Sequence, residues 1–245
     1  MELIDLLDKT RTINNLIQKA SGESLTYDDI AEVLANIMES NILIAGHRGR
    51  SLGTAQPFHG PGFDFPNSEI QEEQLSDSFN TWALGVLTTE VTRKGSGGRQ
   101  LVVSPVYGGG DRLGTVIYLR EKPFSIADVI LAEAGAMAVG IKVQRQKNAI
   151  AEKEFRKKGA VNLATEVLSF SELEAVKFLF LELEGHEGFV VASKLAQKHG
   201  LTRSVIVNAL RKLESAGVIE ARSLGMKGTF IRVLNEYLFA QLERV

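Results

Sequence analysis

Apolar residues recur at helical spacing near the start of the chain. The first such run predicts an amphipathic helix over residues 2–19. A second helix is expected to begin after Thr26 and to end near Ser40, because Thr26 and Asp29 have the spacing of a capping box.

Strand and turn signals follow these two helices. We expect a loop rich in glycine and proline over residues 56–67 and a helix over residues 68–79. This order of elements predicts a small α+β domain in which helices cover one face of an antiparallel sheet. The strands are predicted at residues 41–45, near Leu52, and at residues 85–91, 100–106 and 113–120.

A longer helix is predicted for the middle of the chain. Ser125 and Asp128 have the spacing of another capping box, and no proline interrupts residues 126–158. Such a helix is typical of a rigid connector between domains or of a dimer seam. We therefore expect a front domain at residues 1–125, the helix at residues 126–160 and a second domain at residues 161–245.

The last part of the chain has the pattern of a winged helix-turn-helix. A helix is expected to open with a cap at Ser171, and a short helix over residues 191–199 closes at Gly200. Thr202 is the expected N-cap of the next helix, and two strands surround a glycine turn at residues 225–228.

The helix that follows Thr202 is expected to read DNA bases, because the first turn of this helix meets base edges in the fold. Arginine is the commonest reader of guanine, and asparagine binds adenine through two hydrogen bonds. Phosphate contacts position the protein without specifying a sequence. The predicted DNA-contacting residues are Ser193, Thr202, Arg203, Ser204 and Asn208, with Lys212, Arg222, Ser223 and Lys227 for phosphates.

Charge separates the two ends of the chain, although the net charge is only −2. Residues 1–90 carry 14 acidic side chains against five basic ones. Residues 188–232 carry eight basic side chains against two acidic ones. Basic surfaces attract polyanions, and nucleic acid is the first candidate. The alternatives are a winged helix that contacts protein and a charged face that only meets solvent.

Composition excludes several kinds of chemistry. The chain has no cysteine, so it has no disulfide, no thiolate nucleophile and no cysteine-ligated zinc. Its four histidines have no ligand spacing, and we expect no metal site. No apolar run approaches the roughly 18 residues that span a bilayer, and no signal peptide is visible, which favours a cytoplasmic protein without a membrane partner. Residues 108–110 are interpreted as a glycine hairpin turn, since no P-loop lysine follows them.

Several stretches resemble one family of proteins. The longest are LTRSVIVNALRKLESAGVIE over residues 201–220 and RSLGMKGT over residues 222–229. In the front half, KTRTIN at residues 9–14, GGGDRLGT at 108–115 and LAEAGA at 131–136 fit as well. On these residues the chain resembles the CodY family, nutrient-responsive transcription regulators of low-GC Gram-positive bacteria. The resemblance covers nearly the whole chain except about residues 54–100.

The resemblance implies a fold and a function. The fold is α+β, with an N-terminal GAF-like sensor domain, a long linker helix and a C-terminal winged helix-turn-helix, in a homodimer or higher homo-oligomer. The function is that of a DNA-binding regulator, mainly a repressor of nutrient-acquisition and amino-acid biosynthesis genes, at double-stranded DNA operators. The implied effectors are GTP and isoleucine, valine or leucine. We expect no enzyme; an enzymatic front domain stays an alternative, as does a sequence-specific or architectural DNA binder whose front domain binds a different ligand or none.

The same resemblance implies a nucleotide site in the front domain. Its residues are His47, Arg48 and Arg50 in a basic turn, together with Lys147 on the long helix. Arginine suits triphosphate oxygens. Lys142 stands where the family has a glutamate, and a lysine accepts no hydrogen bond from guanine, so we expect weaker guanine selectivity. A solvated basic turn is the alternative.

The implied amino-acid pocket departs from the family pattern. Phe65 and Pro66 match the family's Phe-Pro pair, but residues 57–63 before them hold no arginine for a ligand carboxylate. A buried carboxylate needs a cation or N–H donors. Either backbone donors act here, or the ligand differs, or the pocket is empty and these residues only pack a loop.

Overall fold

The computed structural model describes residues 3–19, 25–59, 70–71, 74–93, 99–183 and 185–244. The chain divides into two compact units, the first at residues 1–148 and the second at residues 149–245. The long helix α4 (Ile126–Glu166) runs past its predicted end and contributes residues to both units.

The first unit is built around an antiparallel sheet of five strands in the order β2-β1-β7-β6-β5. In its register, Ile44 lies opposite Val116, and Val103 lies opposite Ile117. The described elements of this unit besides α4 are α1 (Leu3–Lys19), α2 (Tyr27–Met38), β1 (Asn41–Gly46), β2 (Ser51–Ala55), β3 (Ile70–Gln71), β4 (Gln74–Leu75), α3 (Asp77–Gly85), β5 (Glu90–Arg93), β6 (Gln100–Gly108) and β7 (Asp111–Arg120).

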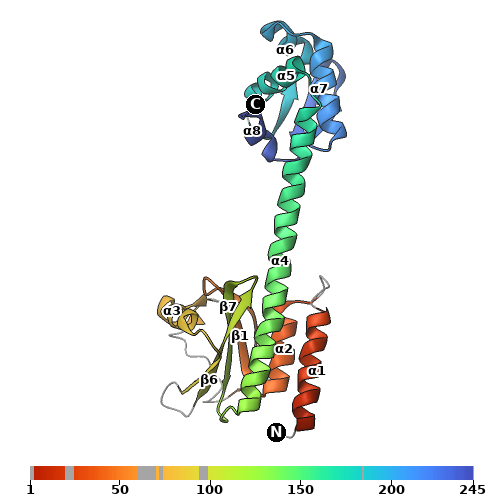
Figure 1. Ribbon diagram of the computed structural model, residues 1–245. Coiled ribbons are helices and arrows are strands. Elements are labelled where there is room, and N and C mark those ends of the chain that lie inside the picture. Colours follow the sequence, from red (N-terminus) through yellow and green to blue (C-terminus); the bar gives the residue numbers. More distant parts are fainter. Residues whose placement is uncertain are drawn as a thin grey trace. The chain divides into compact units, whose positions relative to one another are not determined.

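Helices cover both faces of this sheet, whereas the sequence predicted a cover on one face. On one face, Ile44, Val116 and Tyr118 pack with α1, α2 and the first part of α4. On the other face, Leu43 and Ile117 pack with α3 (Figure 1). Because both faces are buried, β1 and β7 are nearly continuous apolar runs rather than alternating ones.

The predicted helix over residues 68–79 is wrong in its first part. The short strand pair β3–β4 precedes α3, which begins only at Asp77. The Ser76 side chain accepts a hydrogen bond from the Phe79 N–H and so caps α3. Because α3 extends through Gly85, β5 begins later than predicted.

Both capping boxes predicted in this unit are confirmed. Thr26 and Asp29 exchange side-chain and backbone hydrogen bonds at the start of α2. At the start of α4, the Asp128 carboxylate accepts from the Ser125 N–H at 2.7 Å, and the Ser125 hydroxyl accepts from the Asp128 N–H at 3.3 Å. Each box supplies acceptors for N–H groups that have no partner within the helix.

Small residues let α4 lie close to the sheet. A side-chain carbon at Gly135 would come within 2.6 Å of the Tyr118 hydroxyl, and one at Gly140 within 2.3 Å of the Tyr107 carbonyl oxygen. At Gly140 the obstacle is backbone, so glycine is required there, whereas at Gly135 the ends of the Tyr118 and Leu34 side chains would have to move. Tyr107 leads into the predicted glycine hairpin at residues 108–110, which is confirmed between β6 and β7.

The second unit packs helices against a sheet of three strands in the order β8-β10-β9. A capping box opens α5 at Ser169 and Glu172, rather than at the predicted Ser171. The order of helix, tight turn, helix and β-hairpin is that of the predicted winged helix-turn-helix. The elements are α5 (Phe170–Glu182), β8 (Glu187–Val190), α6 (Ala192–His199), α7 (Arg203–Ser215), β9 (Ile219–Ser223), a 3-10 turn (Gly225–Lys227), β10 (Thr229–Val233) and α8 (Tyr237–Leu242).

Candidate DNA-binding surface and effector site

The sharp turn between α6 and α7 depends on Gly200. Its φ angle is 67°, and its N–H donates to the Ala196 carbonyl oxygen. The Leu201 N–H donates to the same oxygen at 2.9 Å. A left-handed conformation at a helix end favours glycine, which has no Cβ to clash. The chain therefore leaves α6 and enters α7 within a few residues.

One face of α7 is buried and the other is exposed. Ile206, Ala209 and Leu213 are at most 1% exposed, and they pack into the core of the second unit. Because buried positions recur every three or four residues, the side chains between them point to solvent. The predicted DNA contacts at this surface are all exposed: Ser193 on α6, Thr202 at the N-cap of α7, and Arg203, Ser204 and Asn208 on α7.

The start of α7 offers hydrogen-bond donors to an anion. Thr202 is the N-cap residue, but its side chain accepts no hydrogen bond from the helix backbone. Instead, its Oγ1 lies 2.9 Å from the Ser204 Oγ. The first N–H groups of a helix carry partial positive charge and bind phosphates well. This end of α7 is suited to hold a DNA phosphate beside the exposed Arg203.

The wing is the hairpin formed by β9 and β10. The predicted phosphate contacts Arg222, Ser223 and Lys227 are exposed on it. The Arg222 guanidinium lies 2.6 Å from the Glu220 carboxylate, so its charge is partly balanced in the free protein. Gly228 has a φ angle of 99°, and a side-chain carbon there would come within 2.6 Å of a carbonyl oxygen of β8. Glycine therefore sets the shape of the wing.

Lys212 differs from the other predicted phosphate contacts, because its ammonium group is held by two partners from outside its own helix, whereas Arg222 pairs with a neighbour on its own strand. Its Nζ lies 2.7 Å from the Glu172 Oε2 and donates to the Val167 carbonyl oxygen at 3.0 Å. The hydrogen bond from Lys212 holds the pKa of Glu172 below its usual value, and the Ser169 N–H adds to this effect. Sequence reasoning missed this pair, since its members lie on different helices and share no local spacing.

The implied nucleotide residues lie at one end of the sheet in the first unit. His47, Arg48 and Arg50 are exposed in the turn between β1 and β2. The Gly46 N–H closes this turn by donating to the Arg50 carbonyl oxygen at 2.9 Å. From α3, the Asn80 side chain donates to the His47 carbonyl oxygen at 3.3 Å. The backbone of the turn is thus held while its basic side chains face solvent.

Lys147 reaches the same end of the sheet. Its Nζ lies 3.8 Å from the carboxylate of Asp111, the first residue of β7. The end of β1 pairs with the start of β7 through Gly46 and Gly114, so the turn after β1 and the hairpin before β7 are neighbours. The structure thus brings the predicted cations to one end of the unit, an arrangement suited to several phosphate oxygens.

The first unit has a cavity that sequence reasoning did not anticipate, whereas Phe65 and Pro66 of the implied amino-acid pocket lie outside the described residues. The cavity has a volume of about 330 Å³ and lies between α4 and β6. Ser104 on β6 and Glu133 and Met137 on α4 are among its lining residues. Its residues come from distant parts of the chain, so no local pattern could have predicted it.

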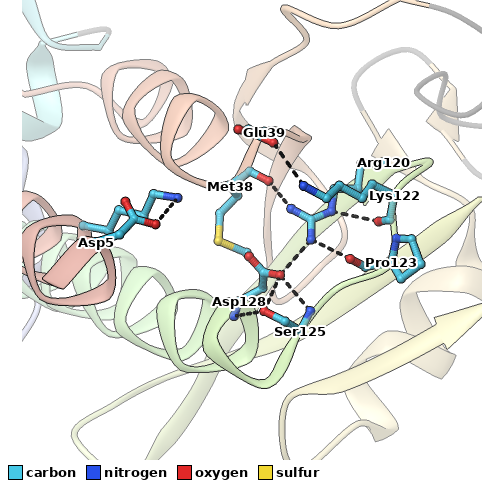
Figure 2. Close-up of polar contacts among 9 residues, drawn as sticks. Asp5, Met38, Glu39, Arg120, Lys122, Pro123, Ser125 and Asp128 are labelled. Atoms are coloured by element: carbon cyan, nitrogen blue, oxygen red, sulfur yellow. Dashed lines mark hydrogen bonds and ion pairs between the residues drawn. The ribbon is translucent and has the colours of Figure 1, made fainter. Parts of the chain in front are cut away.

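A second cavity, of about 290 Å³, lies between α1 and the segment that leads from β7 into α4 (Figure 2). Arg120 lines it and is only 4% exposed. Its guanidinium donates to the Met38 and Pro123 carbonyl oxygens and to the Asp128 carboxylate, the last at 2.7 Å. Burial raises the pKa of Asp128, but hydrogen bonds from Ser125 and Arg120 outweigh it and lower the pKa below its usual value. The cluster fastens the start of α4 to β7 and to the end of α2.

Little in the described part of the chain favours catalysis or metal binding. Among these residues, no three His, Asp or Glu side chains lie together so as to hold a metal ion. No helix within the described ranges is long and apolar enough to cross a membrane. Residues 49–53 have the G-x-S-x-G spacing of a nucleophile elbow, but they lead from a turn into β2, whereas the elbow joins a strand to a helix.

An α+β unit with cavities, followed in the chain by a winged helix-turn-helix whose second helix exposes Arg203, Ser204 and Asn208, is typical of a transcription regulator with a separate sensor-type domain. Comparison with known proteins identifies its family. The model of the CodY helix-turn-helix domain matches residues 186–245, and that of the CodY GAF-like domain matches residues 5–167. The chain belongs to the CodY family of transcriptional regulators.

Curated relatives match over nearly the whole chain. The global transcriptional regulator CodY of Thermoanaerobacter sp. (strain X514) is 45% identical over an alignment of 249 positions, which covers 98% of each chain. That of Brevibacillus brevis is 43% identical over an alignment of 263 positions, which covers 99% of each chain. The cofactor binding GAF domain of the nutrient sensor CodY from Clostridium difficile, a solved structure, is 26% identical with a TM-score of 0.41, covering 58% of this chain and 99% of that one. The full-length relatives confirm the predicted regulator family, in place of the enzyme alternative.

Proposed function

We propose that the chain represses transcription by binding double-stranded operator DNA through α7 and the wing. The observation that carries this proposal is the exposed first turn of α7, where Arg203 and Ser204 project from a helix whose opposite face is buried. In helix-turn-helix proteins this turn meets base edges in the major groove. As in the family, the target genes would be those of nutrient acquisition and amino-acid biosynthesis.

Two substitutions separate base reading from phosphate binding. Arg203→Ala should lower the affinity for operator by about 1–3 kcal/mol and relax the preference at one base pair. Lys227→Ala should weaken all duplexes about equally and reduce the salt slope of log affinity by roughly 0.9. Both are measured by titrating labelled duplex, with the operator defined as the tightest sequence selected from a randomised pool. Operator binding by Arg203→Ala as tight as that of the parent would exclude α7 as the reading helix.

The proposed effector of the first unit is GTP or a related triphosphate at the basic end of the sheet. Arg48, Arg50 and Lys147 would supply the cations that bind the phosphate oxygens. Lys147 would exchange its pair with Asp111, in which both side chains are more than half exposed and which contributes little stability. A coupling free energy of about 1–3 kcal/mol corresponds to a change in DNA affinity of roughly 5- to 150-fold.

This effector site is tested with nucleotides and labelled operator. Arg48→Ala and Lys147→Ala should each abolish the response to triphosphate and spare the basal affinity for DNA. Lys153→Ala removes an exposed cation elsewhere on α4 and should keep the response. Because Lys142 accepts no hydrogen bond from guanine, ATP and GTP should differ little. Identical titration curves with and without triphosphate would remove the nucleotide from the proposal.

Isoleucine, valine or leucine is proposed as a second effector, on the basis of the family resemblance and of Phe65 and Pro66. Residues 57–63 hold no arginine, so backbone N–H groups would bind the ligand carboxylate. Each amino acid should raise the unfolding temperature of the full chain by mass action, and alanine should not. The proposal also includes a homodimer or higher oligomer in the cytoplasm, and sedimentation of the purified chain tests the oligomer.

A further inference from the structure

We propose that Lys212 is a positioning residue for DNA reading, which holds α7 against the junction of α4 and α5 and does not contact a phosphate. The inference rests on the proposed function of α7 as the reading helix. The sequence predicted that Lys212 contacts a DNA phosphate, whereas this inference assigns it a positioning contact inside the protein.

The geometry of the ammonium group carries the first step. Lys212 Nζ donates to the Glu172 Oε2 at 2.7 Å and to the Val167 carbonyl oxygen at 3.0 Å. Two of its three N–H donors are therefore used inside the unit. Val167 directly follows α4, and Glu172 lies in the first turn of α5. One side chain of α7 thus binds the residue that follows α4 and the first turn of α5.

The partner carboxylate has no second cation close by among the described ion pairs, which makes Lys212 hard to release. Glu172 is only 7% exposed, and among the described residues Lys212 is its one ion-pair partner. The same Oε2 accepts the Ser169 N–H at 2.7 Å, as part of the capping box of α5. A buried carboxylate that loses its partner is strongly destabilising. Movement of Lys212 to a DNA phosphate would therefore leave Glu172 uncompensated.

A directional contact at this point matters for reading bases. The buried side chains Ile206, Ala209 and Leu213 attach α7 to the core through apolar contacts, which are not directional. The pair of Lys212 and Glu172 adds a contact with a defined geometry in the last turn of the helix. Arg203 stands on the same helix, so the rotation and depth of α7 decide where its guanidinium meets the groove. The pair should therefore affect the preference for operator over other DNA sequences more than the affinity for DNA in general.

The two roles of Lys212 predict opposite effects for its partner. If Lys212 bound phosphate, Glu172→Gln would release it, remove a negative charge and tighten DNA binding. If Lys212 positions α7, Glu172→Gln should weaken operator binding. The amide oxygen of Gln still accepts the Ser169 N–H, so the capping box of α5 is kept in this variant.

The experiment compares Lys212→Met and Glu172→Gln in the full chain, with the selected operator and an unrelated duplex over a range of salt. Each variant should weaken operator binding by roughly five- to thirtyfold, which corresponds to about 1–2 kcal/mol. Affinity for the unrelated duplex and the salt slope should not change. The double variant should lose no more than the worse single one, because both changes break one interaction.

Lys198→Met is the matched control. Lys198 on α6 lies 2.6 Å from Glu182 of α5, but Lys198 is 65% exposed in this pair. Its loss should leave the ratio of operator to unrelated-duplex affinity unchanged. Thermal unfolding of each variant checks that it is folded. If Lys212→Met does not fold, the Glu172→Gln variant alone tests the proposal.

The outcomes separate this inference from the proposed function. A parent chain that does not distinguish operator from unrelated duplex would overturn the function itself. If the parent does distinguish them, two results would overturn only the positioning role and make Lys212 a phosphate contact. These results are a salt slope reduced by roughly 0.9 in Lys212→Met and tighter DNA binding by Glu172→Gln.

Discussion

The two units use the same helix in opposite ways. In the first unit, α4 lies so close to the sheet that a side-chain carbon at Gly140 would come within 2.3 Å of the Tyr107 carbonyl oxygen. In the second unit, α4 carries Gly159, where such a carbon would meet no described atom within 4 Å. The same residue type on one helix is therefore required in one unit and dispensable in the other.

The attachment of α4 differs between the units in its chemistry as well. In the first unit, a buried ion pair of Arg120 and Asp128 holds the start of the helix. In the second unit, the Asn235 side chain donates a neutral hydrogen bond to the Lys157 carbonyl oxygen at 2.8 Å. Since an unpaired buried charge costs more than a lost neutral hydrogen bond, the first attachment should be the more sensitive one.

The largest expected effect is that of Arg120→Met. It leaves the Asp128 carboxylate without its cation and several carbonyl oxygens without their donor, which should destabilise the first unit by about 3–5 kcal/mol. Trp82, the single tryptophan of the chain, lies in this unit and reports its unfolding in urea by fluorescence. The control Lys122→Met removes a cation that is 76% exposed and 3.9 Å from Glu39, and should cost less than about 1 kcal/mol. Equal losses in the two variants would contradict the role of the buried pair.

Acid should weaken the same attachment. The pKa of Asp128 is lowered in the folded chain, because hydrogen bonds from Ser125 and Arg120 outweigh the opposite effect of burial. A lowered pKa contributes stability above the unfolded-chain value of about 3.9, and this contribution is lost as the pH falls through the folded value. Between about pH 5 and pH 2, the parent should therefore lose stability more steeply than Asp128→Asn. Parallel pH curves in urea unfolding would exclude this linkage.

A smaller loss is expected for Gly140→Ala. Alanine favours a helix interior over glycine by roughly 1 kcal/mol, but here its Cβ meets a backbone oxygen that cannot move without the strand. Displacement of α4 from the sheet should destabilise the first unit by about 1–3 kcal/mol. The same urea titration with Trp82 fluorescence measures it. A gain in stability would show that the close approach of α4 and β6 relaxes easily.

Local sequence signals predicted where helices begin, but they failed where two candidate N-cap residues lie close together. The capping boxes at Thr26 and Ser125 each depend on a residue three positions later, and both are confirmed. Ser169 and Ser171 both precede a glutamate at that spacing. The structure uses Ser169, whose partner Glu172 also binds Lys212, 40 residues further along the chain. A choice that depends on a distant helix cannot be made from spacing alone.

Periodicity likewise showed which faces are buried, but not what covers them. The exposed position of Arg203 followed from the helical period of α7, since it needs only the alternation of apolar and polar residues. The helical cover on the second face of the sheet could not be predicted in this way. Leu43 and Ile117 on that face are ordinary apolar strand residues, and nothing in the local sequence indicates that α3 covers them. The pairing of Lys147 with Asp111 also arises only from the tertiary packing of α4 on the hairpin.

The smallest expected effect, and the one of opposite sign, is that of Gly159→Ala. Glycine in a helix interior lowers stability by about 0.5–1 kcal/mol relative to alanine, and no described atom obstructs a Cβ at this position. The substitution should therefore stabilise the second part of α4 by about that amount. Amide hydrogen exchange within residues 149–166 measures it, since protection of these amides reports local opening of the helix. Slower exchange there, with unchanged exchange in α2, would sharpen the contrast between the two glycines; faster exchange would mean that Gly159 serves a contact that the isolated chain does not make.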